Sequence, residues 1–226
     1  MISGLAPISK GKAYMIGFRK TKIIILLLIS FSFLGKTRAV EGEAAMSEKA
    51  GKYETAVFGG GCFWCMQPPF DALDGVISTR VGYCGGDWEN PSYEDVCTGK
   101  TGHTEAIEVV FDPSVVSYER LLEVFWRNID PTTLNRQFAD TGTQYRTAVF
   151  YRNEGQKKAA LKSKKELDES GKFDKPVVTA VEPATVFYEA ESYHQDYYMK
   201  NSIHYEMYKK GSGREDYLKE TWGNGK

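Results

Sequence analysis

Between residues 55 and 188, short apolar runs and alternating apolar and polar positions predict a set of strands. In an alternating run every second side chain faces the same side of a sheet, and a short apolar run is typical of a strand covered on both faces. Residues that favour turns separate these runs. The predicted strands span residues 55–58, 76–83, 106–111, 147–151, 177–182 and 185–188.

Two longer helices are predicted, the first from apolar residues at helical spacing and the second from a run rich in lysine and glutamate. The first begins at Ser117, and Asp130 followed by Pro131 ends it. The second spans residues 154–170 and is followed by Gly171, the residue type expected just after a helix. The apolar positions of the first helix are Leu121, Leu122, Phe125, Trp126 and Ile129. Strands mixed with helices, without regular alternation, predict an α+β fold of two layers with a mixed sheet.

The remaining segments are predicted as loops with short helices. Proline removes a backbone donor and restrains the residue before it, so a helix near residues 68–73 is expected to begin at Pro68 rather than at Cys62. Residues 84–103 are expected to form a long loop, and loops of this length tend to be functional. After Ser192 the chain has no clean period, which predicts a short helix and wrapping coil.

Residues 1–46 differ from the rest and predict a secretory leader. Arg19, Lys20 and Lys22 precede thirteen uncharged, mostly apolar residues, 23–35, and small residues follow at 37–39 and 44–45. Thirteen residues are short for a transmembrane helix, which needs about 20. A retained membrane anchor is the alternative. Export to the periplasm or another extracytoplasmic space is expected, and a cytoplasmic location if the leader is not used.

Composition limits the class of protein. The formal net charge of −1 offers no strong field for nucleic acid, and 42% hydrophobic residues suffice for one domain with a substantial core. Four cysteines are too few for a disulfide scaffold at this length. Residues 47–52 are charged and small and are predicted to be a linker, so the folded domain is expected to begin at Tyr53.

The candidate chemistry lies directly after the first predicted strand. Three glycines, residues 59–61, permit a tight turn, and a cysteine placed after such a turn can lie near free backbone N–H groups that stabilise its thiolate. Cys62 stands there, and Cys65 supplies a second thiol three residues later. A lone cysteine is more often a buried structural residue, but the second thiol favours redox chemistry.

These residues and several motifs that follow resemble the peptide methionine sulfoxide reductases that act on the S epimer. The resemblance covers residues 53–200 in order and spacing. The matching motifs are residues 61–65 (GCFWC), 82–86 (GYCGG), 90–93 (NPSY), 102–106 (GHTEA), 125–126 (FW) and 142–146 (GTQYR). It implies that residues 53–226 form the catalytic domain, with a ferredoxin-like core and extended, coil-rich termini.

The resemblance implies that the enzyme reduces methionine S-sulfoxide, free or in oxidised proteins, and so repairs oxidative damage. Cys62 is then the nucleophile that attacks sulfur and becomes a sulfenic acid. Glu105, Tyr93 and Tyr145 correspond to the residues that protonate or hydrogen-bond the departing oxygen, and burial must raise the pKa of Glu105 for this task. Asp140 corresponds to an acid that orders the polar groups.

The aromatic and acidic candidates also have plainer interpretations. Phe63 and Trp64 are expected to form an apolar wall for the substrate methyl group, with ordinary core packing as the alternative. A solvated carboxylate is the alternative for Glu105, and a turn cap for Asp140. His103 and His194 lie in matched segments and are expected to have structural roles.

Cys65 is the predicted resolving thiol, because a C-x-x-C spacing in a turn can bring two sulfurs to bonding distance. Cys84 and Cys97 are the other candidates, and no cysteine follows Cys97. No cofactor is expected: the resemblance implies an external dithiol, usually thioredoxin, as reductant. Nucleic acid is not an expected partner, and membrane contact is expected through the N-terminal segment alone.

Other site types and functions fit less well. The four cysteines lack the second close pair of a structural zinc site, so no metal is expected. A general thiol–disulfide oxidoreductase is suggested by the C-x-x-C spacing, but Phe63, Trp64 and the two prolines fit it poorly. A non-catalytic module that binds methionine-rich partners through the aromatic residues is the other alternative.

Overall fold

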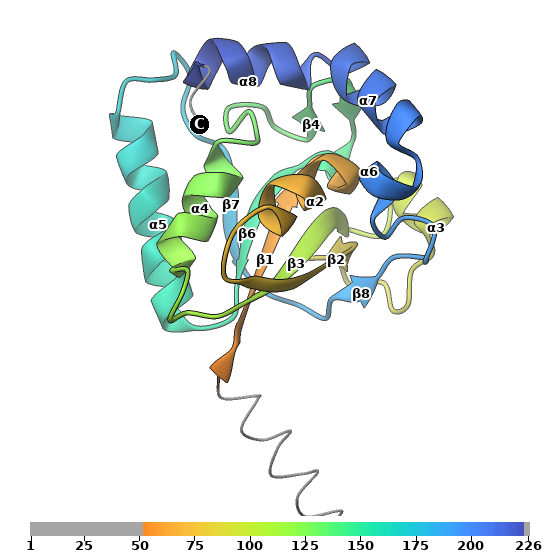
Figure 1. Cartoon of the computed structure of the whole chain (residues 1–226), viewed down its shortest axis with the longest axis horizontal. Coiled ribbons are helices and arrows are strands. Elements are labelled where there is room, and N and C mark those ends of the chain that lie inside the picture. Colours follow the sequence, from red (N-terminus) through yellow and green to blue (C-terminus); the bar gives the residue numbers. More distant parts are fainter. Residues whose placement is uncertain (1–51, 224–226) are drawn as a thin grey trace, which may run out of the picture. The chain divides into compact units, whose positions relative to one another are not determined.

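A computed structural model describes residues 52–223, whose core is a six-stranded sheet (Figure 1). The predicted leader, residues 1–46, and predicted linker residues 47–51 lie outside the described residues. The strands are β1 (Glu54–Gly60), β2 (Val76–Cys84), β3 (Thr104–Phe111), β6 (Thr147–Tyr151), β7 (Ala180–Pro183) and β8 (Tyr188–Glu189), in the order β7-β6-β1-β3-β2-β8. Strands β6 and β7 are parallel and the other pairs are antiparallel, so the predicted mixed sheet is confirmed.

Strand β1 lies in the middle of the sheet and carries the chain to the cysteines. Phe58 pairs with Ile107 of β3 and with Val149 of β6, and all three side chains are fully buried. The neighbouring Val57 points to the opposite face, where it packs in a cluster with Phe150, Cys84, Ala106 and Ala148. Because both faces are covered, β1 is a short apolar run rather than an alternating one.

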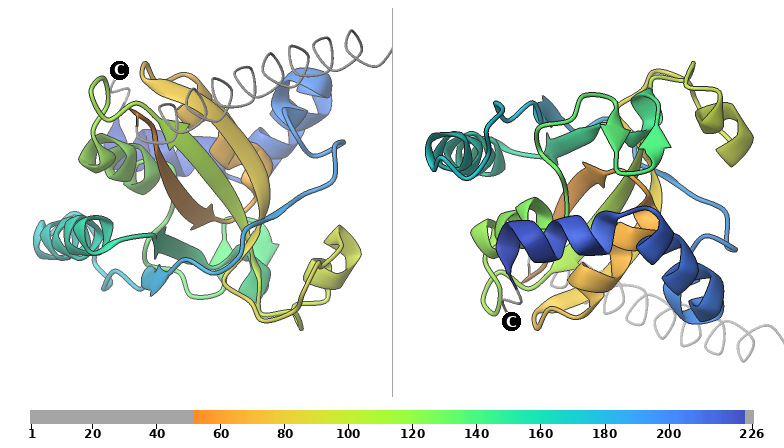
Figure 2. Two further views of the ribbon diagram at one scale, coloured as in Figure 1. Left: turned by 90° about the horizontal axis from the view of Figure 1, so that it is seen from below. Right: turned by 90° about the horizontal axis from the view of Figure 1, so that it is seen from above.

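Two helices cover one face of the sheet, namely α2 (Phe63–Asp71) and α4 (Tyr118–Trp126). Phe58 stacks on Phe70 of α2 with 5.3 Å between ring centroids, and on Phe125 of α4 with 5.1 Å. Helix α5 (Glu154–Glu169) packs beside α4 at the β7 side of the sheet (Figures 1 and 2). Both predicted longer helices are therefore present.

Helix α2 begins at Phe63, not at Pro68 as predicted, and both prolines lie inside it. Their missing N–H groups leave the carbonyls of Trp64 and Cys65 without intrahelical partners. The helical φ that each proline ring favours fits the helix, and burial of Phe63, Met66 and Phe70 against the sheet stabilises it. As a consequence Cys62 is the residue that immediately precedes the helix.

The predicted loop 84–103 contains a short helix, α3 (Tyr93–Cys97). Ser92 caps it: the hydroxyl of Ser92 accepts from Asp95 N, and the Asp95 carboxylate accepts from Ser92 N. The predicted loop before Gly142 holds a two-stranded pair, β4 (Arg136–Gln137) and β5 (Asp140–Thr141). A 3-10 turn, η1 (Thr143–Tyr145), leads into β6.

The chain after Ser192 is largely helical, so the coil predicted there is wrong. Its helices are α6 (Tyr197–Lys200), α7 (Ser202–Gly211) and α8 (Arg214–Trp222). Few of their residues are buried, which explains why the sequence shows no apolar period. This helical segment packs against α2, on the side where the cysteines lie (Figures 1 and 2).

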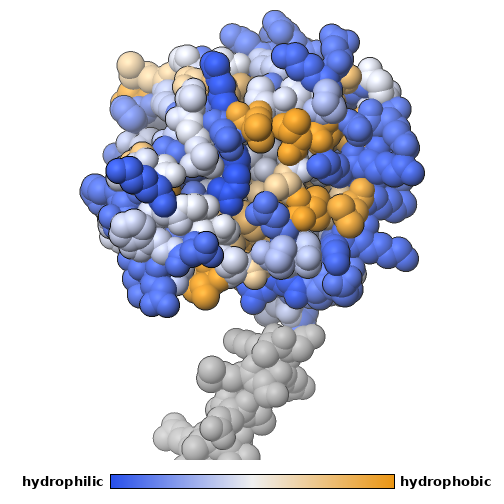
Figure 3. Space-filling view, turned by 180° about the vertical axis from the view of Figure 1, so that it is seen from behind, coloured by the Kyte–Doolittle hydropathy of each residue, from blue (hydrophilic) through white to orange (hydrophobic). Residues whose placement is uncertain are grey.

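The face of the molecule turned away in Figure 1 is mostly hydrophilic, with apolar residues gathered in a few patches (Figure 3). Within residues 52–223, no helix combines the length and the apolar character needed to cross a membrane.

Candidate active site

A small cavity lies where the start of α2 meets β3, α3, β5, η1 and α7. Its volume is about 110 Å³. The structure brings all seven predicted catalytic and substrate-binding residues to its wall, although they come from distant parts of the sequence. An eighth residue, Tyr208, was not predicted. The lining residues are Cys62, Phe63, Trp64, Tyr93, Glu105, Asp140, Tyr145 and Tyr208.

Cys62 is held at the start of α2 by the glycine turn that follows β1. Gly61 has φ +76°, and a Cβ there would lie 2.4 Å from the Cβ of Gln137, so this position requires glycine. The Cys62 side chain is 6% exposed, and burial raises its pKa well above the usual value for a thiol. The helix N-terminus and a hydrogen bond with Tyr208 favour its thiolate in the opposite direction.

Cys65 lies one turn further along α2, and its thiol interacts directly with that of Cys62. Cys65 N donates to Cys62 O at 3.0 Å, so backbone and side chain both tie the two residues together. The hydrogen bond from the Cys62 thiol lowers the pKa of Cys65, and the positive charge of Arg214 lowers it further, against the effect of burial. The ionisation of the two thiols is therefore coupled, because the hydrogen bond between them favours a negative charge on Cys65 and disfavours one on Cys62.

Glu105, on β3, is buried beside the cysteine and is not a solvated carboxylate. Phe63 N donates to Glu105 Oε2 at 3.0 Å, which joins the first turn of α2 to the acid. Burial raises the pKa of Glu105 to about 8, helped by the negative charge of Asp140 and opposed by the Phe63 N–H. At neutral pH the carboxyl group is mostly protonated and can donate a proton.

Tyr93 and Tyr145 present two hydroxyl groups to the same cavity. Burial raises the pKa of both, and the neighbouring Glu105 adds to the shift, so both hydroxyls remain protonated donors. Tyr93 is the first residue of α3, and its backbone N–H donates to the carboxylate of Glu191 at 2.9 Å.

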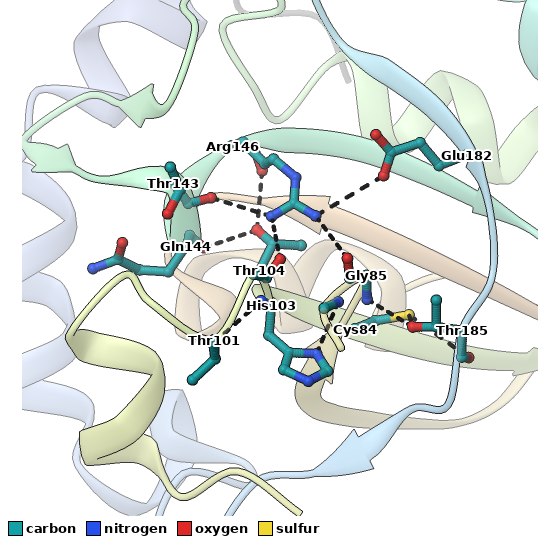
Figure 4. Close-up of polar contacts among 12 residues, drawn as sticks. Cys84, Gly85, Thr101, His103, Thr104, Thr143, Gln144, Arg146, Glu182 and Thr185 are labelled. Carbon is teal, nitrogen blue, oxygen red and sulfur yellow. Dashed lines mark hydrogen bonds and ion pairs between the residues drawn. The ribbon is translucent and has the colours of Figure 1, made fainter. Parts of the chain in front are cut away.

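Arg146, the residue after Tyr145, fastens η1 to the neighbouring loops (Figure 4). Its guanidinium donates to the carbonyls of Gly102 at 3.1 Å and Thr143 at 3.3 Å. Thr104, the residue before Glu105, donates its hydroxyl to Gln144 O at 2.8 Å. These bonds tie the chain on either side of the cavity, so that Tyr145 and Glu105 lie at the same wall.

Phe63 and Trp64 form an apolar wall backed by the C-terminal segment. Tyr197 stacks on Trp64 with 3.8 Å between ring centroids, and Trp64 Nε1 donates to His194 Nδ1 at 3.1 Å. His194 is buried against both aromatic rings, and burial lowers its pKa, so the ring is neutral. His103 lies elsewhere: its ring bonds Gly86 N and Trp88 O and holds the loop after β2.

Asp140 and Tyr208 are joined by a hydrogen bond from the tyrosine hydroxyl to the carboxylate. Burial raises the pKa of Asp140, and the hydrogen bond from Tyr208 and the positive charge of Arg214 oppose this shift. The Tyr208 hydroxyl also interacts with Cys62, so one side chain of α7 bridges the acid and the thiol. The one signal available for Tyr208 was the richness of the C-terminal segment in tyrosine, which does not single out this residue.

The remaining cysteines occupy different environments. Cys84 is fully buried on the opposite face of the sheet, with its sulfur 3.6 Å from Thr185 Oγ1 (Figure 4). Cys97 is exposed at the end of α3 and interacts with the Tyr93 hydroxyl. Cys65 alone among the three has direct contact with Cys62 in the part of the chain that the structure describes. Across residues 52–223, no group of three histidine, cysteine or acidic side chains is arranged to hold a metal ion.

Comparison with known proteins agrees with this arrangement. A family model described as "Peptide methionine sulfoxide reductase" matches residues 54–226. Peptide methionine sulfoxide reductase MsrA of Bacillus subtilis is 53% identical over 178 residues, which cover 79% of this chain and 99% of that protein. The protein of the same name from Methanothermobacter thermautotrophicus is 59% identical over 150 residues, covering 66% of this chain and 89% of its own.

Solved structures show the same fold. The reduced form of Mxr1 from Saccharomyces cerevisiae aligns with a TM-score of 0.64 at 34% identity, covering 67% of this chain and 87% of that chain. Methionine sulfoxide reductase A of Corynebacterium diphtheriae aligns with a TM-score of 0.60 at 35% identity, covering 67% and 76%. The chain therefore belongs to the peptide methionine sulfoxide reductase family and is an oxidoreductase that reduces methionine sulfoxide.

Proposed function

We propose that the cavity binds the S epimer of methionine sulfoxide and that Cys62 attacks its sulfur. The observation that carries this proposal is the buried Glu105 carboxyl group, protonated at neutral pH and bonded to Phe63 N, the residue after the thiol. A volume of about 110 Å³ corresponds to roughly three to four water molecules, enough for a sulfinyl group and its methyl. Phe63 and Trp64 supply the apolar wall for that methyl group.

The first step transfers oxygen from the substrate to Cys62. As Cys62 attacks, its proton passes to the Cys65 thiolate to which it is hydrogen-bonded, and Glu105 gives its proton to the sulfoxide oxygen. The hydroxyls of Tyr93 and Tyr145 stabilise that oxygen with hydrogen bonds. The substrate sulfur is reduced by two electrons and leaves as the sulfide, while Cys62 becomes a sulfenic acid.

Cys65 resolves the sulfenic acid. Its sulfur attacks Cys62, the sulfur–oxygen bond breaks, and the hydroxyl leaves as water with the proton that Cys65 releases. The resulting disulfide is opened by an external dithiol, and the family resemblance supports a thioredoxin-like one. Cys84 lies on the opposite face of the sheet, and Cys97 interacts with the Tyr93 hydroxyl, whereas Cys65 interacts with Cys62 itself, which favours Cys65 over both.

The test of the reaction is turnover of methyl p-tolyl sulfoxide with dithiothreitol. We expect consumption of one enantiomer alone, and loss of this activity in Cys62→Ser because a serine hydroxyl is scarcely ionised near neutral pH. Consumption of neither enantiomer would favour a binding module or a general thiol–disulfide oxidoreductase.

The resolving step is tested separately. After oxidation with one equivalent of substrate, peptide mapping by mass spectrometry should find a Cys62–Cys65 disulfide as the first product. A Cys62–Cys84 or Cys62–Cys97 link, or a persistent sulfenic acid, would contradict the role of Cys65.

The domain organisation and location belong to the same proposal. We propose that residues 53–226 form the catalytic domain and that its core is ferredoxin-like, which the strand order β6-β1-β3-β2, with α2 and α4 on one face, supports. Residues 1–46 are proposed to direct export and to provide any membrane contact. The reductant is then a thiol carrier that acts outside the cytosol.

A further inference from the structure

Arg214, the first residue of α8, is a buried cation whose contacts are with uncharged groups. Its side chain is 3% exposed, and within residues 52–223 it forms no ion pair. The guanidinium donates to Gly60 O at 2.9 Å, Asn128 O at 2.6 Å and Met66 Sδ at 3.5 Å. It also lies over the ring of Phe138, 4.6 Å from the centroid. Burying a charge is costly unless a countercharge compensates it. The charge of Arg214 lowers the pKa of the Asp140 carboxyl group, but the two side chains form no ion pair among the described residues, so these contacts include no direct countercharge.

The guanidinium touches the chain on both sides of the cysteine pair. Gly60 lies two residues before Cys62, and Met66 follows Cys65 directly. A Cβ at Gly61 would lie 3.2 Å from Arg214 Nη2, so the charge sits immediately beneath the glycine turn. A cation at the N-terminus of a helix is unfavourable for that helix, so α8 itself gives no reason for an arginine here.

We propose that Arg214 is a positioning residue that acts through Cys65, holding the negative charge of the cysteine pair on this resolving thiol. The inference deepens the proposed function, because it rests on Cys65 as the resolving thiol. The Cys65 thiolate then provides the buried cation with a countercharge in the reduced enzyme. The segment α7–α8 then contributes an electrostatic element to the reaction as well as the Tyr208 hydroxyl.

The charges around Cys65 support this assignment. The hydrogen bond from Cys62 is the largest influence that lowers the pKa of Cys65, and Arg214 is the next, while burial raises the pKa. Lys209 on α7 acts in the same direction as Arg214, and Asp140 on β5 acts against it. Other titratable groups facing the pair are Glu105 on β3 and Tyr205 and Tyr208 on α7.

Arg214 then favours the first step, in which the Cys65 thiolate accepts the Cys62 proton, and it acts directly on the second step. Cys65 must supply an electron pair to the Cys62 sulfur as the sulfur–oxygen bond breaks, and the thiolate is the reactive form. A nearby buried cation favours that form. Without it, less Cys65 thiolate is available at neutral pH and the disulfide should form more slowly.

The test compares Arg214→Met, Arg214→Gln and Arg214→Lys with the unchanged chain. Methionine fills much of the same volume without a buried charge, so this variant should fold even where glutamine disturbs packing. Ultraviolet thiolate absorbance is recorded against pH for each protein and for its Cys65→Ser form. The difference between the two curves gives the pH at which Cys65 ionises. We expect it to rise by about one unit or more in Arg214→Met and Arg214→Gln, and to stay near the original value in Arg214→Lys.

The rate of disulfide formation after one equivalent of substrate gives the second measurement. A rise of about one unit should slow this step about tenfold at neutral pH, and the rate should recover as the pH is raised. In a Cys65→Ser background, Arg214→Met should leave sulfenic acid formation unchanged, because its effect passes through Cys65. Lys219→Met, on the exposed side of α8, is the matched control for removing a positive charge from that helix, and it should change neither quantity.

Failure of this inference is distinguishable from failure of the proposed function. If the unchanged protein forms no Cys62–Cys65 disulfide, the resolving role of Cys65 fails, and this inference with it. If that disulfide forms, but a folded Arg214→Met variant keeps both the ionisation of Cys65 and the rate of disulfide formation, Arg214 has no such role. Equal shifts in Arg214→Lys and Arg214→Met would also overturn the inference, since the positive charge would not be responsible.

Discussion

A single carboxyl group, Glu105, shows how burial produces a functional residue from an ordinary one. A glutamate in water is ionised at neutral pH and cannot protonate a sulfoxide. Enclosed in the cavity beside Asp140 and the cysteine pair, it keeps its proton to about pH 8. Its hydrogen bond with Phe63 N at the same time fixes it next to Cys62.

Glu105→Gln should slow sulfenic acid formation by about 10²–10⁴-fold, because an amide cannot give up a proton to the departing oxygen. In the unchanged protein the same step needs the protonated acid, so its rate should fall as the pH rises through about 8. Single-turnover measurements across this range check both points. A rate within a few-fold of the original in Glu105→Gln would exclude Glu105 as the acid.

The same substitution should change how stability depends on pH. Between about pH 4.5 and 8 the folded protein holds a proton on Glu105 that the unfolded chain has lost, so the free energy of unfolding falls as the pH rises through this window. The fall is at most about 1.4 kcal/mol per pH unit. Glutamine does not titrate, so urea unfolding at several pH values should show the unchanged protein losing stability relative to Glu105→Gln from pH 5 to 8. Parallel curves would contradict the buried, protonated state.

Tyr93→Phe and Tyr145→Phe should each slow sulfenic acid formation less than Glu105→Gln, because each removes one hydrogen bond to the oxygen and leaves the acid in place. The double substitution should slow it more than either change alone. Single-turnover rates of the three variants give the measurement. Full activity in the double variant would place the oxygen elsewhere in the cavity.

At the scale of elements, the junction between β1 and α2 decides where the nucleophile lies. The strand ends at Gly60, Gly61 makes a turn with positive φ, and the helix begins one residue after Cys62. Two prolines remove hydrogen bonds further along the helix, and burial of its apolar face compensates for them. The junction places the thiol at a helix N-terminus, next to a carboxyl group from another strand.

Gly61→Ala should destabilise the fold and reduce activity, because it adds a Cβ against Gln137 at a position with φ +76°. Gly171→Ala is the matched control: φ there is +68°, but nothing lies within 4 Å of the added Cβ. Backbone strain alone costs about 1–3 kcal/mol, so the control reports that part and Gly61→Ala should cost clearly more. Thermal unfolding compares the two, and equal losses would mean that the turn tolerates the contact.

At the scale of the whole molecule, the site is closed by the end of the chain. The segment from α6 to α8 stacks Tyr197 on Trp64, brings Tyr208 to Asp140 and Cys62, and places Arg214 under the glycine turn. A cavity made by segments so far apart in the sequence exists only when the entire domain has folded. Within residues 52–223, every side chain that lines the cavity belongs to Cys62 or to a later residue.

Removal of residues 1–45 should therefore leave a soluble protein with full reductase activity. The full-length chain, expressed in a Gram-negative host, should lose its leader and appear outside the cytoplasm. Cell fractionation and the mass of the mature protein check this expectation. An intact chain found in the cytosol would overturn the export proposal.

Several features were determined by the sequence itself. Local apolar patterns predicted the central strands and α4, because each of these elements buries a contiguous face. The run rich in lysine and glutamate before Gly171 predicted α5. The motif around Cys62 and its ordered companions predicted the family. Six of the seven predicted site residues lie in those motifs and Asp140 lies two residues before one of them, and the structure brings all seven to one cavity.

Tertiary structure decided the rest, because each remaining feature depends on contacts between residues that are far apart in the sequence. The start of α2 depends on packing against the sheet, which outweighs the local effect of Pro68 and Pro69. The positions of Tyr208 and Arg214 depend on helices that bury few residues and therefore have no apolar period. The pKa values of Glu105 and the cysteines depend on burial and on charges from other elements, and sequence neighbours carry no information about either.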